Sequence, residues 1–103
     1  MPVVIRSRVR APIALYDAVH AEVLRRSSGT VEGLVAHIGV PTEEGFEVIE
    51  VWESAKAFEY YTETLIGPVV ATLSAGHTGP PPETTTEQEQ VRGLLIPGAS
   101  IVI

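Results

Sequence analysis

The stretch GLVAHIGVPTEEGFEVIEVW, residues 33–52, predicts a β-hairpin from which the rest of the fold follows. Segments 31–40 and 46–53 are rich in valine, isoleucine and aromatic residues, which favour strands, and Pro41 and Gly45 bracket a turn between them. If residues 42–45 form a four-residue loop, antiparallel pairing places His37 opposite Glu50. The same register pairs Pro41 with Phe46, Ile38 with Ile49, Ala36 with Val51, and Val35 with Trp52.

This register gives the hairpin two different faces, because side chains alternate along a strand. One face is wholly apolar and consists of Leu34, Ala36, Ile38, Ile49 and Val51. The other face mixes polar and apolar side chains and consists of Val35, His37, Val48, Glu50 and Trp52. We expect helices to pack on the apolar face and an enclosed, partly polar space to lie over the mixed face. Any function is expected in that space.

Length and composition indicate one folded domain. The chain has 103 residues, of which 45% are hydrophobic. Thirteen acidic and seven basic residues give a net charge of −6, which disfavours nucleic acid and anionic membranes as partners. With no cysteine there is no disulfide or thiolate chemistry. No charged-then-apolar leader and no membrane-length apolar stretch is present, so we expect a cytoplasmic protein.

The order of elements predicts an α+β fold. A strand over 2–9 precedes an amphipathic helix over 13–26, which Ser27, Ser28 and Gly29 end. After the hairpin, Ser54 caps a second helix over 55–65, and Gly67 and Pro68 interrupt it before it resumes toward residue 76. A proline-rich connection then leads to a strand over 84–96. The sum is a ferredoxin-like β-α-β-β-α-β domain over residues 1–96.

Two further expectations concern assembly. Helices on one face of the sheet leave the other uncovered, and packing two such faces together gives a homodimer with a barrel-like interior. The apolar tail 97–103 either adds a strand to a neighbouring subunit or covers a partner subunit, or it forms an edge strand within its own subunit. Whether it enlarges the dimer into a higher assembly is left open.

The segment GLVAHIGVPTEEGFEVIEVWESAKAF, residues 33–58, resembles the dimeric α+β barrel superfamily, and within it the small antibiotic-biosynthesis-monooxygenase-like proteins. The resemblance is carried by VWES, residues 51–54, followed by Ala57 and Phe58, and by GLVAH, residues 33–37. It implies a dimeric barrel and an activity among cofactor-free oxygenases of quinol-like and anthrone-like substrates, haem-degrading enzymes, or proteins without known activity. The haem-degrading branch has an asparagine, a tryptophan and an axial histidine where this chain has Ser7, Tyr61 and about Leu73, and His77 follows shortly after. These departures disfavour haem as a cofactor.

The predicted pair of His37 and Glu50 is the main candidate for chemistry. A carboxylate orients a histidine and makes it more basic, so His37 is suited to accept a proton from a phenol or enol. The resulting phenolate can pass an electron to dioxygen without a metal or flavin, so no cofactor is expected. The predicted substrate-binding residues are Val35, Val48, Trp52, Phe58 and Tyr61.

A non-catalytic alternative remains beside this hypothesis. His37 and Glu50 can satisfy each other inside a non-catalytic homodimer that binds a small molecule or a protein partner. His20 is expected on a helix flank. A metal site is not predicted, because the three histidines fall on separate elements and none has the spacing that presents two ligands from one helix.

Overall fold

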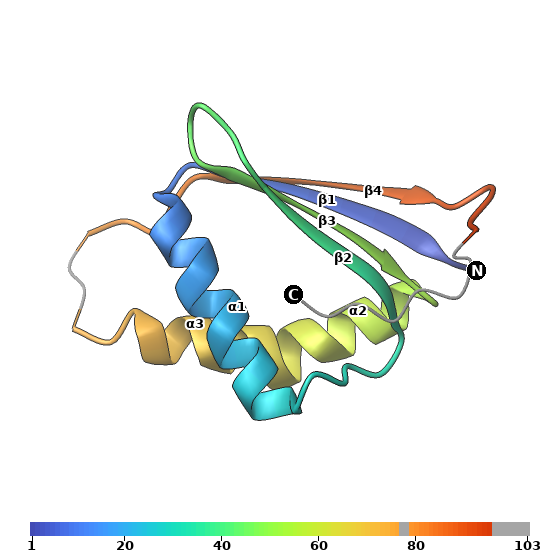
Figure 1. The fold of residues 1–103 in the computed structure, drawn as a ribbon, viewed down its shortest axis with the longest axis horizontal. Coiled ribbons are helices and arrows are strands. Elements are labelled where there is room, and N and C mark those ends of the chain that lie inside the picture. Colours follow the sequence, from blue (N-terminus) through green and yellow to red (C-terminus); the bar gives the residue numbers. More distant parts are fainter. Residues whose placement is uncertain (77–78, 96–103) are drawn as a thin grey trace.

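The computed structural model of the chain describes residues 1–76 and 79–95. The predicted order is confirmed, with the second helix built from three segments. The elements are β1 (Val3–Val9), α1 (Ile13–Ser27), β2 (Leu34–Pro41), β3 (Phe46–Trp52), α2 (Ala55–Tyr61), η1 (Thr62–Ile66), α3 (Gly67–Leu73) and β4 (Thr84–Gln90). This is the ferredoxin-like α+β fold (Figure 1).

The four strands form one antiparallel sheet in the order β2-β3-β1-β4, and the helices lie on one side of it (Figure 1). The predicted hairpin register is confirmed for His37 with Glu50 and for Ile38 with Ile49. The predicted partner of Trp52 was wrong. Leu34 takes that place instead of Val35, because a β-bulge between Leu34 and Ala36 adds one residue to β2.

The helices cover the mixed face of the hairpin, so the prediction that they cover the apolar face was wrong. Phe46, Glu50 and Trp52 are buried, whereas Ile38 on the opposite face is 52% exposed. The physical reason is visible once β1 is added, because its buried side chains, Val3 and Ile5, point to the same side as Phe46 and Trp52. Covering this face therefore removes more apolar area from water than covering the other.

The hydrophobic core lies between the sheet and the helices. It joins strand residues to one valine of α1 and to the helical run after β3, and its buried members are Val3, Ile5, Val23, Trp52, Tyr61 and Val69. Trp52 and Val69 have no exposed surface. This core fixes the distance between α1 and the sheet, and the candidate site lies in the same layer.

The second helix starts as predicted and continues differently. Ser54 caps α2, since its Oγ accepts the Ala57 amide hydrogen at 3.1 Å. The predicted break in the helix at Gly67 and Pro68 is not found. The chain stays helical there, and its irregularity is the π-helical turn η1 just before Gly67. Pro68 has no amide hydrogen, and the Gly67 amide bonds to the carbonyl of Thr62, five residues earlier.

Strand β4 ends at Gln90, short of the predicted Ile96, and all seven of its residues are exposed. The predicted roles of His77 and of the tail 97–103 fall outside the described residues. Within residues 1–76 and 79–95, no helix combines the length and apolar character that a membrane span needs.

Candidate active site between the sheet and helix α1

The predicted His37 and Glu50 pair is present and faces α1. The His37 Nδ1 atom lies 2.7 Å from Glu50 Oε2 across β2 and β3. Glu50 is 6% exposed, and its other oxygen, Oε1, accepts a hydrogen bond from the Trp52 indole Nε1 at 3.3 Å. Both carboxylate oxygens thus have a donor, as a buried carboxylate requires.

Tyr16 of α1 extends this hydrogen-bonded chain. Its hydroxyl oxygen lies 2.8 Å from Nε2 of His37. Because Nδ1 faces a carboxylate, the neutral imidazole carries its hydrogen on Nδ1, and Nε2 accepts the hydrogen of the Tyr16 hydroxyl. The chain therefore runs from Trp52 through Glu50 and His37 to Tyr16.

Contacts between aromatic and imidazole rings hold Tyr16 at its end of the hydrogen-bonded chain. The Tyr16 ring stacks on His20 and His37 with centroid distances of 5.4 and 5.9 Å, and Phe46 meets it edge-on at 5.5 Å. His20 also stacks on His37 at 5.2 Å. Sequence reasoning missed Tyr16 and His20, although their spacing of four residues places both on one face of α1. The missing information was which face of the sheet α1 covers.

Gly39 makes room for Tyr16. A Cβ atom added at Gly39 would lie 2.2 Å from the Cζ atom and from the hydroxyl oxygen of Tyr16. Any side chain at this position of β2 would therefore displace the Tyr16 ring. The absence of a side chain at Gly39 is part of how the hydroxyl reaches His37.

Burial and charge set the protonation of the nearby hydroxyls. Burial raises the pKa of Tyr16 above its usual 10.0, and the negative charges of Glu50 and Asp17 raise it further. Burial raises the pKa of Tyr61 more strongly, again with a contribution from Glu50. Both hydroxyls are protonated at neutral pH, so Tyr16 is a hydrogen-bond donor to His37.

The predicted substrate-binding residues divide by burial. Trp52 and Tyr61 belong to the core, with 0% and 7% of their surface exposed, and their rings are 4.8 Å apart. Phe58 is half-buried and meets Trp52 edge-on at 5.8 Å. Val35, at the bulge, and Val48, opposite Gly39, are half-buried as well. Whether these residues bind a substrate stays a prediction.

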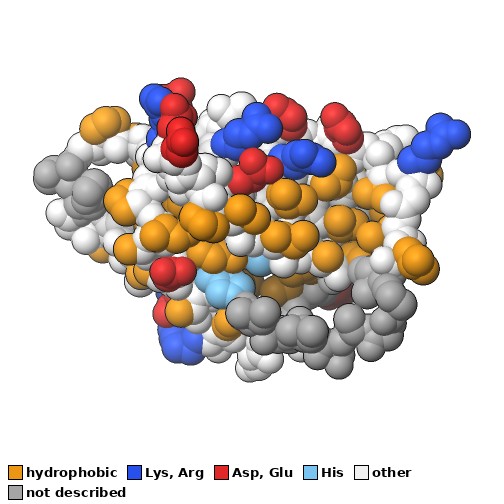
Figure 2. Space-filling model, turned by 45° about the horizontal axis from the view of Figure 1, so that its top comes forward, with side chains coloured by type: hydrophobic (Ala, Val, Ile, Leu, Met, Phe, Trp, Pro, Cys, Tyr) orange, Lys and Arg blue, Asp and Glu red, His pale blue; other side chains and the backbone are white. Residues whose placement is uncertain are grey.

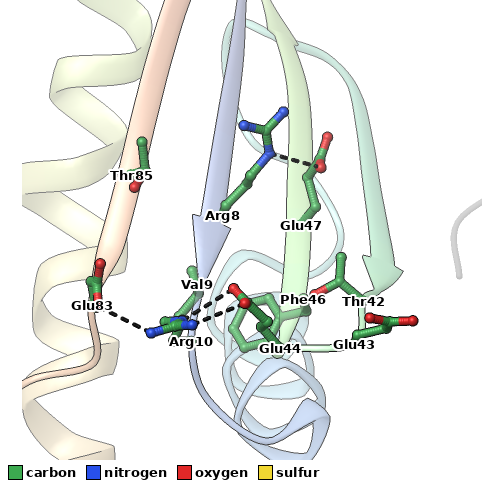
Figure 3. A pocket seen from close by; sticks show the side chains of 10 residues that line it. All are labelled: Arg8, Val9, Arg10, Thr42, Glu43, Glu44, Phe46, Glu47, Glu83 and Thr85. Atoms are coloured by element: carbon green, nitrogen blue, oxygen red, sulfur yellow. Dashed lines mark hydrogen bonds and ion pairs between the residues drawn. The ribbon is translucent and has the colours of Figure 1, made fainter.

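Two open hollows lie elsewhere, at the tip of the hairpin. They measure about 630 and 620 Å³ and share Arg10, Thr42, Glu43 and Glu44. Figure 3 shows Arg10 of the larger hollow between Glu44 and Glu83, with contacts of 2.9 and 3.7 Å. Neither hollow is lined by His37, Glu50 or Tyr16. Among their charged side chains, Arg8, Arg10, Glu44, Glu47 and Glu83 are engaged in ion pairs within the chain.

Metal binding finds no support among the side chains that the structure describes. Over residues 1–76 and 79–95, no group of three or more histidine, cysteine, aspartate or glutamate side chains is arranged to hold a metal ion. His37 and Glu50 instead engage each other, with Tyr16 and Trp52 at the two ends of the chain.

The fold defines the class of protein to which this chain is similar. Structures of the antibiotic-biosynthesis-monooxygenase type match it over most of their length, so the resemblance in residues 33–58 is confirmed at the level of fold. A candidate antibiotic biosynthesis monooxygenase from Caulobacter crescentus superposes with a TM-score of 0.66, at 13% identity, over 89% of this chain and 91% of the other.

Two further structures carry named activities of their own. SnoaB, a cofactor-independent oxygenase from Streptomyces nogalater, matches with a TM-score of 0.59 and 19% identity over 91% of this chain and 94% of that chain. The haem-degrader MhuD from Mycobacterium tuberculosis, solved with two haems in its active site, matches with a TM-score of 0.52 and 22% identity over 90% and 98%. No protein-family model and no curated protein matches the chain. At these identities the likeness establishes the fold alone.

Proposed function

We propose that this protein is a small cofactor-independent monooxygenase-like enzyme that acts on an aromatic or polyketide-like molecule. One observation carries the proposal, the hydrogen-bonded chain in which His37 lies between a buried carboxylate and a tyrosine hydroxyl. A carboxylate at Nδ1 stabilises the imidazolium that forms when Nε2 takes up a proton. The arrangement therefore suits His37 to act as a general base.

The proposed reaction begins with proton transfer. The substrate loses the proton of a phenolic or enolic hydroxyl, and the electron pair of the broken O–H bond stays on the substrate oxygen. His37 becomes an imidazolium, balanced by Glu50. The substrate anion then passes an electron to dioxygen, and the two radicals combine to a peroxide. For an anthrone, the His37 imidazolium returns its proton to the peroxide, and loss of water from the hydroperoxide, with the hydrogen of the oxygenated carbon, leaves one oxygen atom in a new carbonyl group and the other in water.

Half-buried apolar residues supply the proposed binding surface for the aromatic part of the substrate. Val35, Val48 and Phe58 have partial exposure, whereas Trp52 and Tyr61 support them from within the core. In this proposal Trp52 acts mainly through its indole N–H, which holds the Glu50 carboxylate toward His37. Trp52 is thus a positioning residue.

We further propose that two copies associate through the uncovered sheet face. Figure 2 shows hydrophobic side chains gathered over this face, with charged side chains along one margin. Its apolar members include Val4, Ala36, Ile38, Ile49 and Val51. A continuous apolar face on a sheet is stable in water when a second such face covers it. The same dimer serves the alternative function, non-catalytic binding of a small molecule or partner protein.

Oxygen uptake separates the enzyme from the binder. The purified chain, treated with a metal chelator, is mixed with a panel of quinols and anthrones under heavy-isotope dioxygen. The proposal expects catalytic oxygen consumption, with one labelled atom in each product molecule formed from an anthrone. Saturable binding of the same compounds without oxygen consumption would support the binder instead.

A haemin titration tests the remaining alternative, haem binding, which the fold match to the haem-degrader MhuD suggests. The proposal expects no stoichiometric shift of the Soret band. A saturable shift that disappears in His77→Ala would assign the chain to haem chemistry and overturn the cofactor-independent proposal.

A further inference from the structure

We propose that the Tyr16 hydroxyl, and not the His37 ring itself, contacts the substrate, and that the substrate presents an acidic O–H group, as a phenol or an enol does. This inference rests on the proposed function and specifies the same site. In this inference Tyr16 is a catalytic residue that takes the substrate proton, and His37 accepts the proton that Tyr16 gives up.

Both ring nitrogens of His37 are engaged in the structure. Nδ1 faces Glu50 at 2.7 Å, and Nε2 faces the Tyr16 hydroxyl at 2.8 Å. A substrate that approached His37 directly would have to displace one of these partners. Glu50 is buried by the sheet and the helices, while Tyr16, at the other end of the hydrogen-bonded chain, is only partly buried. The His37 side chain is 23% exposed, and Figure 2 shows histidine side chains at the surface beside the hydrophobic band.

The Tyr16 hydroxyl oxygen can still accept a hydrogen bond from a substrate. The Tyr16 hydroxyl donates its single hydrogen to Nε2 of His37, so the lone pairs on its oxygen remain free to accept a hydrogen bond from another donor. A substrate hydroxyl donates to that oxygen in the proposed complex. As the substrate O–H bond breaks, its proton joins the Tyr16 oxygen, and the original Tyr16 proton moves to Nε2. The electron pair stays on the substrate, and the imidazolium is neutralised by Glu50.

Tyr16 is also held where this transfer needs it. Its ring is fixed by His20, His37 and Phe46, and Gly39 allows it to lie directly against β2. A donor and acceptor fixed before the substrate arrives need little rearrangement during proton transfer. Carbon acids that have no enol form lack the hydroxyl to donate to Tyr16 and are expected to be poor substrates.

A coloured phenol tests this inference without requiring turnover. 4-Nitrophenol absorbs at longer wavelength when it is ionised, so its protonation on the protein can be read directly. It is titrated into the parent chain, Tyr16→Phe, His37→Ala and the matched control Tyr60→Phe, at a pH below the pKa of the free phenol. Tyr60 lies on α2 and is 66% exposed. Circular dichroism confirms that each variant is folded.

The inference expects the parent and Tyr60→Phe to bind the dye with its ionised fraction raised on the order of tenfold, the effect of one pKa unit. Tyr16→Phe and His37→Ala are expected to bind it without that increase. An unchanged increase in Tyr16→Phe, with its loss in His37→Ala, would show direct contact with His37 and overturn the inference. So would failure of the parent to bind or ionise the dye. Ionisation of the dye by the protein without oxygen uptake on any quinol or anthrone would contradict the oxygenase proposal and leave this inference standing.

Discussion

The ring of Tyr16 rests on the backbone of Gly39, so closely that a Cβ atom there would lie 2.2 Å from the Tyr16 Cζ and hydroxyl oxygen. This contact joins α1 to the edge strand β2 at the level of His37. In this position the Tyr16 hydroxyl oxygen lies 2.8 Å from Nε2 of His37.

Gly39→Ala is expected to destabilise the fold by about 1–3 kcal/mol, the usual range for overpacking. The added methyl group pushes the Tyr16 ring away from β2 and breaks its hydrogen bond to His37. Denaturant unfolding of the variant and the parent measures the cost. Gly93→Ala is the matched control, because a Cβ atom at Gly93 meets nothing within 4 Å. Equal stabilities of the two variants would show that Tyr16 moves aside without cost.

Glu50→Ala is expected to cost about 2 kcal/mol of unfolding free energy. The change leaves the indole N–H of Trp52 and Nδ1 of His37 without their acceptor in a largely buried layer. Glu50→Gln keeps an acceptor oxygen and is expected to cost less. Unfolding curves at one protein concentration provide both numbers.

Glu44→Ala is the control for that comparison. It removes an exposed ion pair with Arg10, which solvent screens, and is expected to change stability far less than Glu50→Ala does. If Glu50→Ala proved as mild as this surface substitution, the carboxylate would have no part in ordering the site.

Glu22 is expected to make stability depend on pH in acid. Hydrogen bonds from Arg25 and Arg26 lower its pKa from 4.5 to about 2. A lowered pKa in the folded chain means that ionised Glu22 stabilises the fold above about pH 4.5, and that this contribution is lost as the pH falls toward 2.

Glu22→Gln should accordingly flatten the loss of stability over that acid range, and added salt should weaken the effect because the group is at the surface. Carboxyl carbon chemical shifts follow the titration of Glu22 itself. A titration midpoint near 4.5 would contradict the pairing with the two arginines, and Glu59→Gln on α2 serves as the control substitution.

Ile38→Asp is expected to dissociate the proposed dimer. The side chain is 52% exposed on the uncovered sheet face, where a second copy would bury the new charge. Light scattering with size-exclusion chromatography gives the mass of each species. Val70→Asp, an exposed position on α3, should leave the parent mass unchanged. A dimer that persists in Ile38→Asp, or a monomeric parent, would rule out association through this face.

The sequence was sufficient to predict the hairpin and the central pair of the site. Pro41 and Gly45 fix the turn, and the turn fixes the register that brings His37 to Glu50. The bulge that shifts Leu34 into the place of Val35 could not be predicted, because an extra residue in a strand leaves no mark in its composition.

The side of the sheet that the helices cover depends on residues distant in sequence. The hairpin alone favours burying its apolar face, whereas β1 contributes Val3 and Ile5 to the opposite face and reverses the balance. Tyr16 and His20 were missed for the same reason. Their part in the site follows only from where α1 lies, and that depends on the packing of the whole core.

The most direct test of the account is the initial rate of oxygen consumption by His37→Ala, measured with the most reactive quinol or anthrone against the parent and against Glu44→Gln. We predict a loss of about a hundredfold or more in His37→Ala, the usual contribution of a general base, and no loss in Glu44→Gln. A rate in His37→Ala equal to that of the parent would contradict the claim that this histidine, held by Glu50 and Tyr16, is the base that becomes protonated when the substrate ionises.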